Sequence, residues 1–282
     1  MNIIIIGTGI KEQLMLGLCY KSELLEKIYT VSHEPLEDIP NVDYKNYRDL
    51  LQKIKLLQVD IALILDKKYI DDGLVEMLKR NRINVICVNR KWLNLEKSRL
   101  VGKQLSVHYS INVPQNIKAP THFPVVLKSD NSFISEKVFA NSIEELIDKR
   151  KEFSAIDPSS KVFIEEYIDG DEYSLVSLWD GAGMYYFPAL SDTRIGLSEV
   201  QMDRLDLLKT KLNFMFSDEK ADFIGFVVTK LLWAKNDWYV LEYKMTLDDI
   251  DVKNIITTLK SDFLQLLRSA IYQKLGNSEV SR

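Results

Sequence analysis

The stretch that decides the fold is Lys161–Leu175, which reads KVFIEEYIDGDEYSL. An apolar strand ends there in two carboxylates, Glu165 and Glu166, and the turn Tyr167–Gly170 leads into a second strand that contains Glu172. One interpretation is an exposed strand end whose acidic side chains only keep the chain in solution. The other is a hinge that hydrogen-bonds the edge of a base through its backbone, while a carboxylate accepts hydrogen bonds from sugar hydroxyls.

Three other segments favour the second interpretation. Phe123–Lys128, FPVVLK, places a lysine at the end of an apolar strand, so that its ammonium points into the cleft there. Trp238–Lys244, WYVLEYK, ends a strand with Glu242, a carboxylate in position to hold a divalent cation. Leu95–Arg99, LEKSR, lies on a connecting helix ahead of a proline-rich loop.

Residues 1–90 alternate short apolar strands with helices. Continuous apolar strands separated by helices are typical of a parallel sheet that is covered on both faces. This segment is therefore predicted to form a small doubly wound α/β domain. Strands are expected at Asn2–Ile6, Lys27–Ser32, Asp60–Leu65 and Asn84–Asn89, and helices at about 10–25, 46–57 and 69–82.

The pattern changes after a helix at Lys91–His108 and the loop Asn112–Pro124. Adjacent hairpins then predict a largely antiparallel sheet, so this half is α+β. We expect a Rossmann-like domain at 1–112 and a second domain at 113–282, with a lid subdomain at about 125–168 and a sheet subdomain at about 169–275. Strands are expected at Val125–Lys128, Lys137–Ala140, Val162–Ile168, Glu172–Trp179, Met184–Leu190, Phe223–Ala234 and Trp238–Lys244, and helices at Asn141–Phe153, Ser198–Asn213 and about 253–274.

Composition excludes several classes of function. The chain of 282 residues has 37 Lys and Arg against 41 Asp and Glu, and this net charge of −4 argues against non-specific nucleic-acid binding. Its apolar runs are too short to span a membrane. With only two cysteines, Cys19 and Cys87, a disulfide framework is excluded and a cysteine metal site is not expected, which fits a reducing cytoplasm.

The familiar catalytic motifs are missing or incomplete. Gly7-Thr8-Gly9 follows the first strand, but Glu12 stands where a dinucleotide fingerprint needs its third glycine, so a tight turn or a loop for another anion is expected. The three histidines have no metal-ligand spacing, and no Gly-x-Ser-x-Gly elbow occurs.

The order and spacing of FPVVLKSD, VFIEEYIDGDEYS, and FIGFVV followed by WYVLEYK resemble the ATP-grasp superfamily, and within it the phosphoribosylamine–glycine ligases. The resemblance covers essentially the whole chain and implies an ATP-grasp fold with an N-terminal doubly wound preATP-grasp domain. The family's C-terminal domain would begin where this sequence stops. The implied activity belongs to purine biosynthesis: ATP phosphorylates the carboxylate of glycine, and the amine of phosphoribosylamine attacks the acyl phosphate. The implied cofactors are ATP and Mg²⁺.

The resemblance also implies roles for individual residues. Lys128 would contact a phosphate or the adenine, Glu172 would hold the ribose and Glu242 would bind Mg²⁺. Glu166 and Ile168 would lie in the adenine hinge. Gly7, Gly9 and Glu12 would lie near the sugar-phosphate substrate.

The phosphate loop and the metal site depart from the family pattern. The family's KADGxxxGKGV loop is KSDNSFISEKV here, with Glu136 at the position of its second lysine and Lys137 one residue later as a partial substitute. Loss of the glycines restricts the backbone conformations that cradle phosphate. The family's E-F-N is Glu242-Tyr243-Lys244, and an ammonium cannot coordinate Mg²⁺, although Lys244 can neutralise phosphate directly.

Two hypotheses therefore stay open, with a third behind them. The first is a divergent ATP-dependent carboxylate–amine ligase with impaired or altered activity. The second is a non-catalytic ATP-grasp relative that binds nucleotide weakly or not at all and acts through a protein partner or as a homo-oligomer. The third is an unrelated Rossmann-like binding module.

Overall fold

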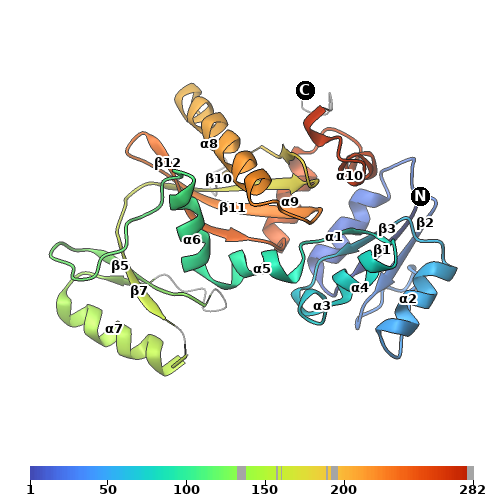
Figure 1. The fold of residues 1–282 in the computed structure, drawn as a ribbon, viewed down its shortest axis with the longest axis horizontal. Coiled ribbons are helices and arrows are strands. Elements are labelled where there is room, and N and C mark those ends of the chain that lie inside the picture. The colour runs from blue at the N-terminus through green and yellow to red at the C-terminus, as the bar shows by residue number, and fades with distance from the viewer. Residues whose placement is uncertain (132–137, 157, 160, 189, 192–195, 278–282) are drawn as a thin grey trace.

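The computed structural model describes residues 1–131, 138–156, 158–159, 161–188, 190–191 and 196–277. Figure 1 shows three sheets in this part of the chain: a blue N-terminal sheet, a large orange and yellow sheet in the centre, and a small green sheet beside helix α7. Among the described helices, none is both long and apolar enough to cross a membrane.

The N-terminal sheet is parallel, as predicted, with strand order β2-β1-β3-β4. Its central strand β1 is fully buried from Ile3 to Ile6, because helices cover both faces. The helix predicted at 69–82 is instead two helices, since Gly73 between them has a φ of +83°, which an L side chain rarely adopts. The elements are β1 Asn2–Ile6, α1 Ile10–Cys19, β2 Lys27–Val31, α2 Tyr47–Leu56, β3 Ile61–Ile64, α3 Lys67–Asp71, α4 Leu74–Arg80 and β4 Asn84–Ile86.

Two connecting helices, α5 (Arg90–Lys97) and α6 (Arg99–His108), replace the single helix predicted at Lys91–His108. The backbone of Ser98 is extended, and its Oγ accepts a hydrogen bond from the N–H of Val101 at 3.2 Å. Ser98 therefore caps a new helix, which turns Arg99 toward the cleft described below.

The small sheet is antiparallel, with order β6-β5-β7, and α7 packs against it. Its strands are β5 Val125–Ser129, β6 Val138–Ala140 and β7 Val162–Glu166, and α7 spans Ile143–Ile156. The predicted strand Lys137–Ala140 is confirmed from Val138 onward, and Lys137 lies outside the described residues.

The large sheet is antiparallel, with order β10-β8-β11-β12 and with β9 paired to β8. One face packs against α8, while the side chains of the other face pack against α9 and α10. The helix predicted at about 253–274 is two helices, because Asp262 caps α10 through the N–H of Gln265. The elements are β8 Asp171–Trp179, β9 Met184–Tyr186, β10 Leu190–Ser191, α8 Glu199–Asp218, β11 Gly225–Ala234, β12 Asp237–Lys244, α9 Asp249–Thr258, α10 Phe263–Ile271 and a 3₁₀ turn at Leu275–Asn277.

The N-terminal and large sheets share their hydrophobic cores. The N–H of Cys87 donates to the carbonyl of Ile224 at 2.7 Å, and a Cβ on Gly225 would lie 2.9 Å from the backbone of Cys87 and Val88. Glycine is needed there because two backbones meet. Since the cores mix side chains from both sides of residue 112, the domain boundary at that residue stays a prediction.

Candidate functional site

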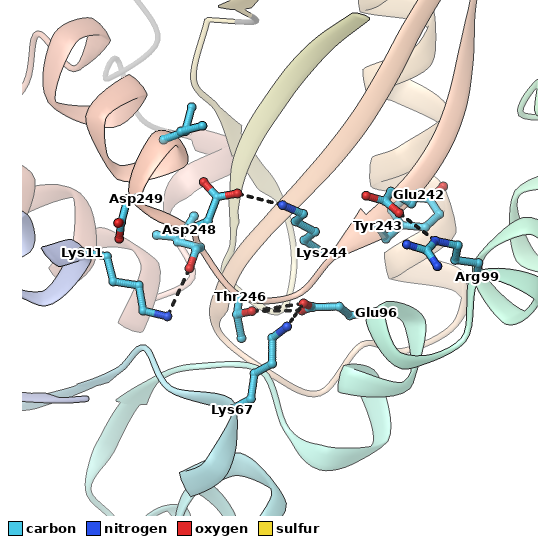
Figure 2. Close-up of a pocket in the computed structure, with 12 residues that line it drawn as sticks. Lys11, Lys67, Glu96, Arg99, Glu242, Tyr243, Lys244, Thr246, Asp248 and Asp249 are labelled. Carbon is cyan, nitrogen blue, oxygen red and sulfur yellow. Dashed lines mark hydrogen bonds and ion pairs between the residues drawn. The ribbon is translucent and has the colours of Figure 1, made fainter. Parts of the chain in front are cut away.

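Two cavities lie along strand β12. The larger, the charged cavity, has a volume of about 850 Å³ (Figure 2). The smaller, the hinge slot, has a volume of about 60 Å³ and lies between β5, β12 and the β7–β8 connection. The charged cavity is lined by Lys11, Lys67, Glu96, Arg99, Glu242, Tyr243, Lys244, Thr246, Leu247, Asp248, Asp249 and Ile250. The hinge slot is lined by Pro114, Val126, Lys128, Phe139, Glu165, Glu166, Tyr167, Ile168, Glu172, Leu232 and Leu241.

A β-bulge in β12 lets neighbouring residues serve both cavities. Lys230 of β11 pairs with Glu242, whereas the next residue, Leu231, pairs with Val240, so Leu241 is an extra residue in the strand. A bulge reverses the alternation of side chains beyond it. Two successive residues, Leu241 and Glu242, therefore face the same side of the sheet, Leu241 toward the hinge slot and Glu242, with Lys244, toward the charged cavity.

The hinge slot combines apolar walls with a buried lysine. Val126, Leu232 and Leu241 supply apolar contacts, and Phe139 lies at the rim with an exposed side chain. Lys128 is only 6% exposed, and its Nζ lies 2.8 Å from Oε2 of Glu165. The lysine predicted from FPVVLK thus lies in the slot, as an ion pair.

Sequence reasoning named Glu166, Ile168 and Glu172, and all three line the slot. It gave no role to Glu165, which is 3% exposed and also accepts from Lys103 Nζ at 2.6 Å. Burial lowers the pKa of Lys103, against the opposing effect of Glu165. The alternation of side chains along VFIEE could have distinguished Glu165 from Glu166. Glu165 shares a face of β7 with Phe163, while the side chain of Glu166 points to the opposite face.

Three cation–carboxylate pairs line the charged cavity, and Figure 2 shows them facing one another from different elements. Arg99 Nε lies 3.0 Å from Glu242 Oε2, and Lys244 Nζ lies 2.7 Å from Asp248 Oδ2. Lys67 pairs with Glu96, whose carboxylate also accepts from the N–H of Met245 at 2.7 Å. Of these six residues, sequence reasoning assigned roles only to Glu242 and Lys244.

The ion pairs favour the charged forms of Glu242, Lys244 and Asp248. Burial raises the pKa of Glu242, but Arg99 together with Lys128 and Lys244 outweighs burial, and the pKa lies below its ordinary value. Burial lowers the pKa of Lys244, but its hydrogen bond to Asp248 and the carboxylates nearby raise the pKa above the usual range. Asp248 has a strongly lowered pKa, because hydrogen bonds from Lys244 and from the backbone of Asp251 outweigh its burial.

Mg²⁺ does not fit the side chains at Glu242. Mg²⁺ binds oxygen ligands in octahedral geometry, and Lys244 offers only a charged ammonium where a second oxygen ligand is required. Glu242 itself is occupied by Arg99. Within the described residues, no cluster of three or more His, Cys, Asp and Glu is arranged to hold a metal. The metal role of Glu242 therefore stays a prediction that this geometry does not support.

The predicted substrate loop lies at the carboxyl end of β1, where parallel sheets commonly bind ligands. Gly7 and Gly9 have φ angles of +146° and +130°, and a Cβ on Gly7 would lie 2.4 Å from Oε1 of Glu12. Glu12 is 4% exposed, and neither of its carboxylate oxygens has a hydrogen-bond partner in another described residue. Burial raises its pKa. Lys11, which sequence reasoning missed, reaches the charged cavity and donates to the carbonyl of Leu65 at 2.8 Å.

A parallel N-terminal sheet and two antiparallel sheets around a cleft define the ATP-grasp class. Phosphoribosylamine–glycine ligase from Thermotoga maritima has this fold, with a TM-score of 0.77 at 20% identity over 97% of this chain and 76% of that one. D-alanine–D-alanine ligase from Bacillus anthracis, in complex with ATP, has a TM-score of 0.62 at 18% identity over 99% of both chains.

Sequence comparison finds distant relatives among the phosphoribosylamine–glycine ligases. Phosphoribosylamine–glycine ligases from Fusobacterium nucleatum and Clostridium acetobutylicum are each 23% identical to this chain, over 99% of its length and 75% and 77% of theirs. The chain is a distant homologue of the phosphoribosylamine–glycine ligases, within the ATP-grasp superfamily. No protein-family model matches it.

Proposed function

We propose that this protein is an ATP-dependent carboxylate–amine ligase, with glycine and phosphoribosylamine as the first substrates to test. One observation carries the proposal: the bulge at Leu241 joins an apolar slot for a base to a cavity lined by cations. A nucleotide that spans this bulge places its adenine beside Val126 and Leu232 and its phosphates toward Lys244. ATP in a related ligase of the same fold supports the choice of nucleotide.

The proposed reaction has two steps. A carboxylate oxygen of the amino acid attacks the γ-phosphorus of ATP, so that the bond to ADP breaks and an acyl phosphate forms. The amine then attacks the acyl carbon, phosphate leaves, and an amide results. Fixed cations stabilise the charge that develops on the phosphoryl oxygens.

In this scheme the residues of the hinge slot bind the adenosine part of the nucleotide, and those of the charged cavity orient its phosphates. Lys128 donates a hydrogen bond to a phosphate or to the adenine. Glu166 and Ile168 lie beside the adenine base, and Glu172 accepts hydrogen bonds from the ribose. Glu12, Gly7 and Gly9 lie near the sugar-phosphate substrate. Lys137 stays a prediction, because it lies outside the described residues.

A specific observation also favours a non-catalytic nucleotide-binding protein. The cations Arg99 and Lys244 are held by carboxylates, and the segment after Lys128 contains none of the glycines of the family's phosphate loop. A protein of this kind binds ATP but does not turn it over.

Two measurements separate these functions. Thermal unfolding with ATP or ADP tests binding: ligand at about 100 times its Kd adds about 2.7 kcal/mol, or roughly 5–10 °C in Tm for a chain of this size. ADP formation that requires both glycine and the amine supports the ligase. Binding without turnover over a panel of carboxylates and amines supports the non-catalytic protein, and no shift at millimolar nucleotide overturns both.

A further inference from the structure

We propose that the charged cavity holds the phosphates of its nucleotide through fixed side-chain cations and needs no divalent metal, with Lys244 in the place of the ion. This inference rests on the proposed nucleotide site and concerns how that site neutralises phosphate.

Of the four carboxylates that line the cavity, those of Glu96, Glu242 and Asp248 are already engaged, and the fourth is that of Asp249. Glu242 accepts from Arg99 at 3.0 Å. Glu96 is 5% exposed and accepts from the N–H of Met245 at 2.7 Å and from Thr246 Oγ1 at 3.0 Å, besides its pair with Lys67. A divalent ion would have to break such contacts to gain the oxygen ligands that it requires.

Asp248 is engaged at both of its oxygens. Oδ2 accepts from Lys244 at 2.7 Å, and Oδ1 accepts from the N–H of Asp251 at 2.9 Å. The second contact belongs to the capping box that begins α9. Asp248 therefore holds Lys244 and starts a helix, two structural roles that leave its carboxylate poorly placed to ligate a metal.

The cations of the cavity come from four different elements. Lys11 is on α1, Lys67 on α3, Arg99 on α6 and Lys244 on β12. Figure 2 shows Lys11, Lys67 and Lys244 around one opening. Lys11 Nζ donates to the carbonyls of Leu65 at 2.8 Å and of Leu247 at 3.4 Å. Both acceptors are uncharged carbonyl oxygens, so neither of these contacts neutralises the ammonium of Lys11.

Lys244 is placed to act on phosphate. It lies two residues after Glu242 on the same side of the bulge, so both side chains face the cavity. An ammonium carries three protons, and its bond to Asp248 uses one of them. Asp248 thus fixes the direction of the side chain while further protons can reach phosphate oxygens. A divalent ion on those same oxygens would be repelled by Lys244.

The test is the affinity of the wild-type protein for ADP and ATP, measured by titration calorimetry in excess EDTA and again in excess Mg²⁺. We expect binding in EDTA to be as tight as in Mg²⁺ or tighter. Binding that is at least about tenfold tighter with Mg²⁺ overturns this inference but leaves the proposed function standing. No binding in either buffer overturns both.

Substitution at Lys244 tests the residue itself. Lys244→Asn supplies the oxygen ligand that the ammonium lacks, so its affinity in EDTA is expected to fall by about tenfold or more, with recovery in Mg²⁺. Lys244→Arg keeps the charge and is expected to keep binding in EDTA. Lys253→Asn, the same change at an exposed position of α9, is the matched control. If Lys244→Asn binds in EDTA as tightly as the wild type, the assignment of Lys244 is wrong.

Discussion

The guanidinium of Arg99 and the carboxylate of Glu242 form an ion pair of 3.0 Å between residues that are 143 positions apart in the sequence. The same guanidinium donates to the carbonyls of Ser129 at 2.8 Å and of Asn131 at 3.2 Å. Arg99 therefore ties helix α6 to the small sheet and to the large sheet at once. Its side chain is 9% exposed, so these contacts are largely shielded from water.

Replacing Arg99 by methionine should destabilise the fold. The substitution keeps an apolar stem but leaves Glu242 and two carbonyls without their donor, and the expected loss is about 2–3 kcal/mol in the free energy of unfolding. Urea denaturation measures it. Arg48→Met, at an exposed position of α2, should change little. Equal stability of Arg99→Met and the wild type would mean that the ion pair contributes nothing.

Glu12→Gln should stabilise the protein near neutral pH. Burial raises the pKa of Glu12 in the folded state above its unfolded value, so the ionised carboxylate opposes folding at pH 7. We expect a gain of about 1 kcal/mol, which should shrink as the pH falls through the folded-state pKa and the wild-type carboxyl becomes neutral. Chemical denaturation at several pH values measures this, with the exposed Glu23→Gln as the control. A variant less stable than the wild type at pH 7 would contradict the argument.

Asp248→Asn should show the opposite dependence on pH. The pKa of Asp248 is lowered in the folded state. The ionised carboxylate therefore contributes to the free energy of unfolding above the unfolded pKa, about 3.9, and this contribution is lost as the pH falls through the acid range. Asparagine still caps a helix, so the loss at pH 7, about 0.5–1 kcal/mol for this partly exposed pair, reports on Lys244. Thermal unfolding from neutral to acid pH measures it.

The control for Asp248→Asn is the same change at the N-cap of the next helix. Asp262 accepts from the N–H of Gln265 at 2.8 Å and from the hydroxyl of Ser22 at 2.8 Å. Neither of these contacts involves a lysine. Asp262→Asn should therefore not show the loss of stability that the contact with Lys244 causes in Asp248→Asn. Equal losses in the two variants would show that capping, rather than the contact with Lys244, accounts for the effect.

Two glycine-to-alanine substitutions should change the free energy of unfolding in opposite directions. A Cβ on Gly170, in the hinge between β7 and β8, would lie 2.3 Å from the backbone oxygen of Trp233, so the hinge must shift at a cost of about 1–3 kcal/mol. Gly17 lies in α1, and apart from its chain neighbours and the backbone of its own helix, nothing lies within 4 Å of such a Cβ. Gly17→Ala should gain about 0.5–1 kcal/mol from the helix preference of alanine. Urea denaturation of both variants tests the pair, and a stabilised Gly170→Ala would refute the packing argument.

The sequence was sufficient for the elements whose signal is local. The strand at Asn2–Ile6 has its predicted bounds, because a continuous run of isoleucines is unambiguous when helices follow. Three of the predicted helices are each two helices in the structure. The breaks lie at Gly73, at Ser98 and before Asp262. At Ser98 and Asp262, a polar side chain caps a new helix within an otherwise continuous pattern.

Residue type and strand position were sufficient to select some of the residues that line the cavities, and their roles stay predictions. Lys128, Ile168 and Lys244 line the cavities, whereas the partners that hold Lys128 and Glu242 were missed. Glu165 and Arg99 act across the fold, and the choice between an exposed acid and a buried ion pair depends on which chain segments become neighbours. That information is not contained in the spacing of either motif.

The extra residue in β12 brings two different kinds of surface together on one face of the sheet. Val240 and Tyr243 lie in the core with α8, whereas the successive residues Leu241 and Glu242 both face the cleft because of the bulge. Deleting Leu241 would leave Val240 paired with Leu231 and Glu242 paired with Lys230 in regular alternation, so Glu242 and Lys244 would keep their directions. The deletion would remove the apolar neighbour of the charged groups, and so would separate the binding of the base from the neutralisation of the phosphates.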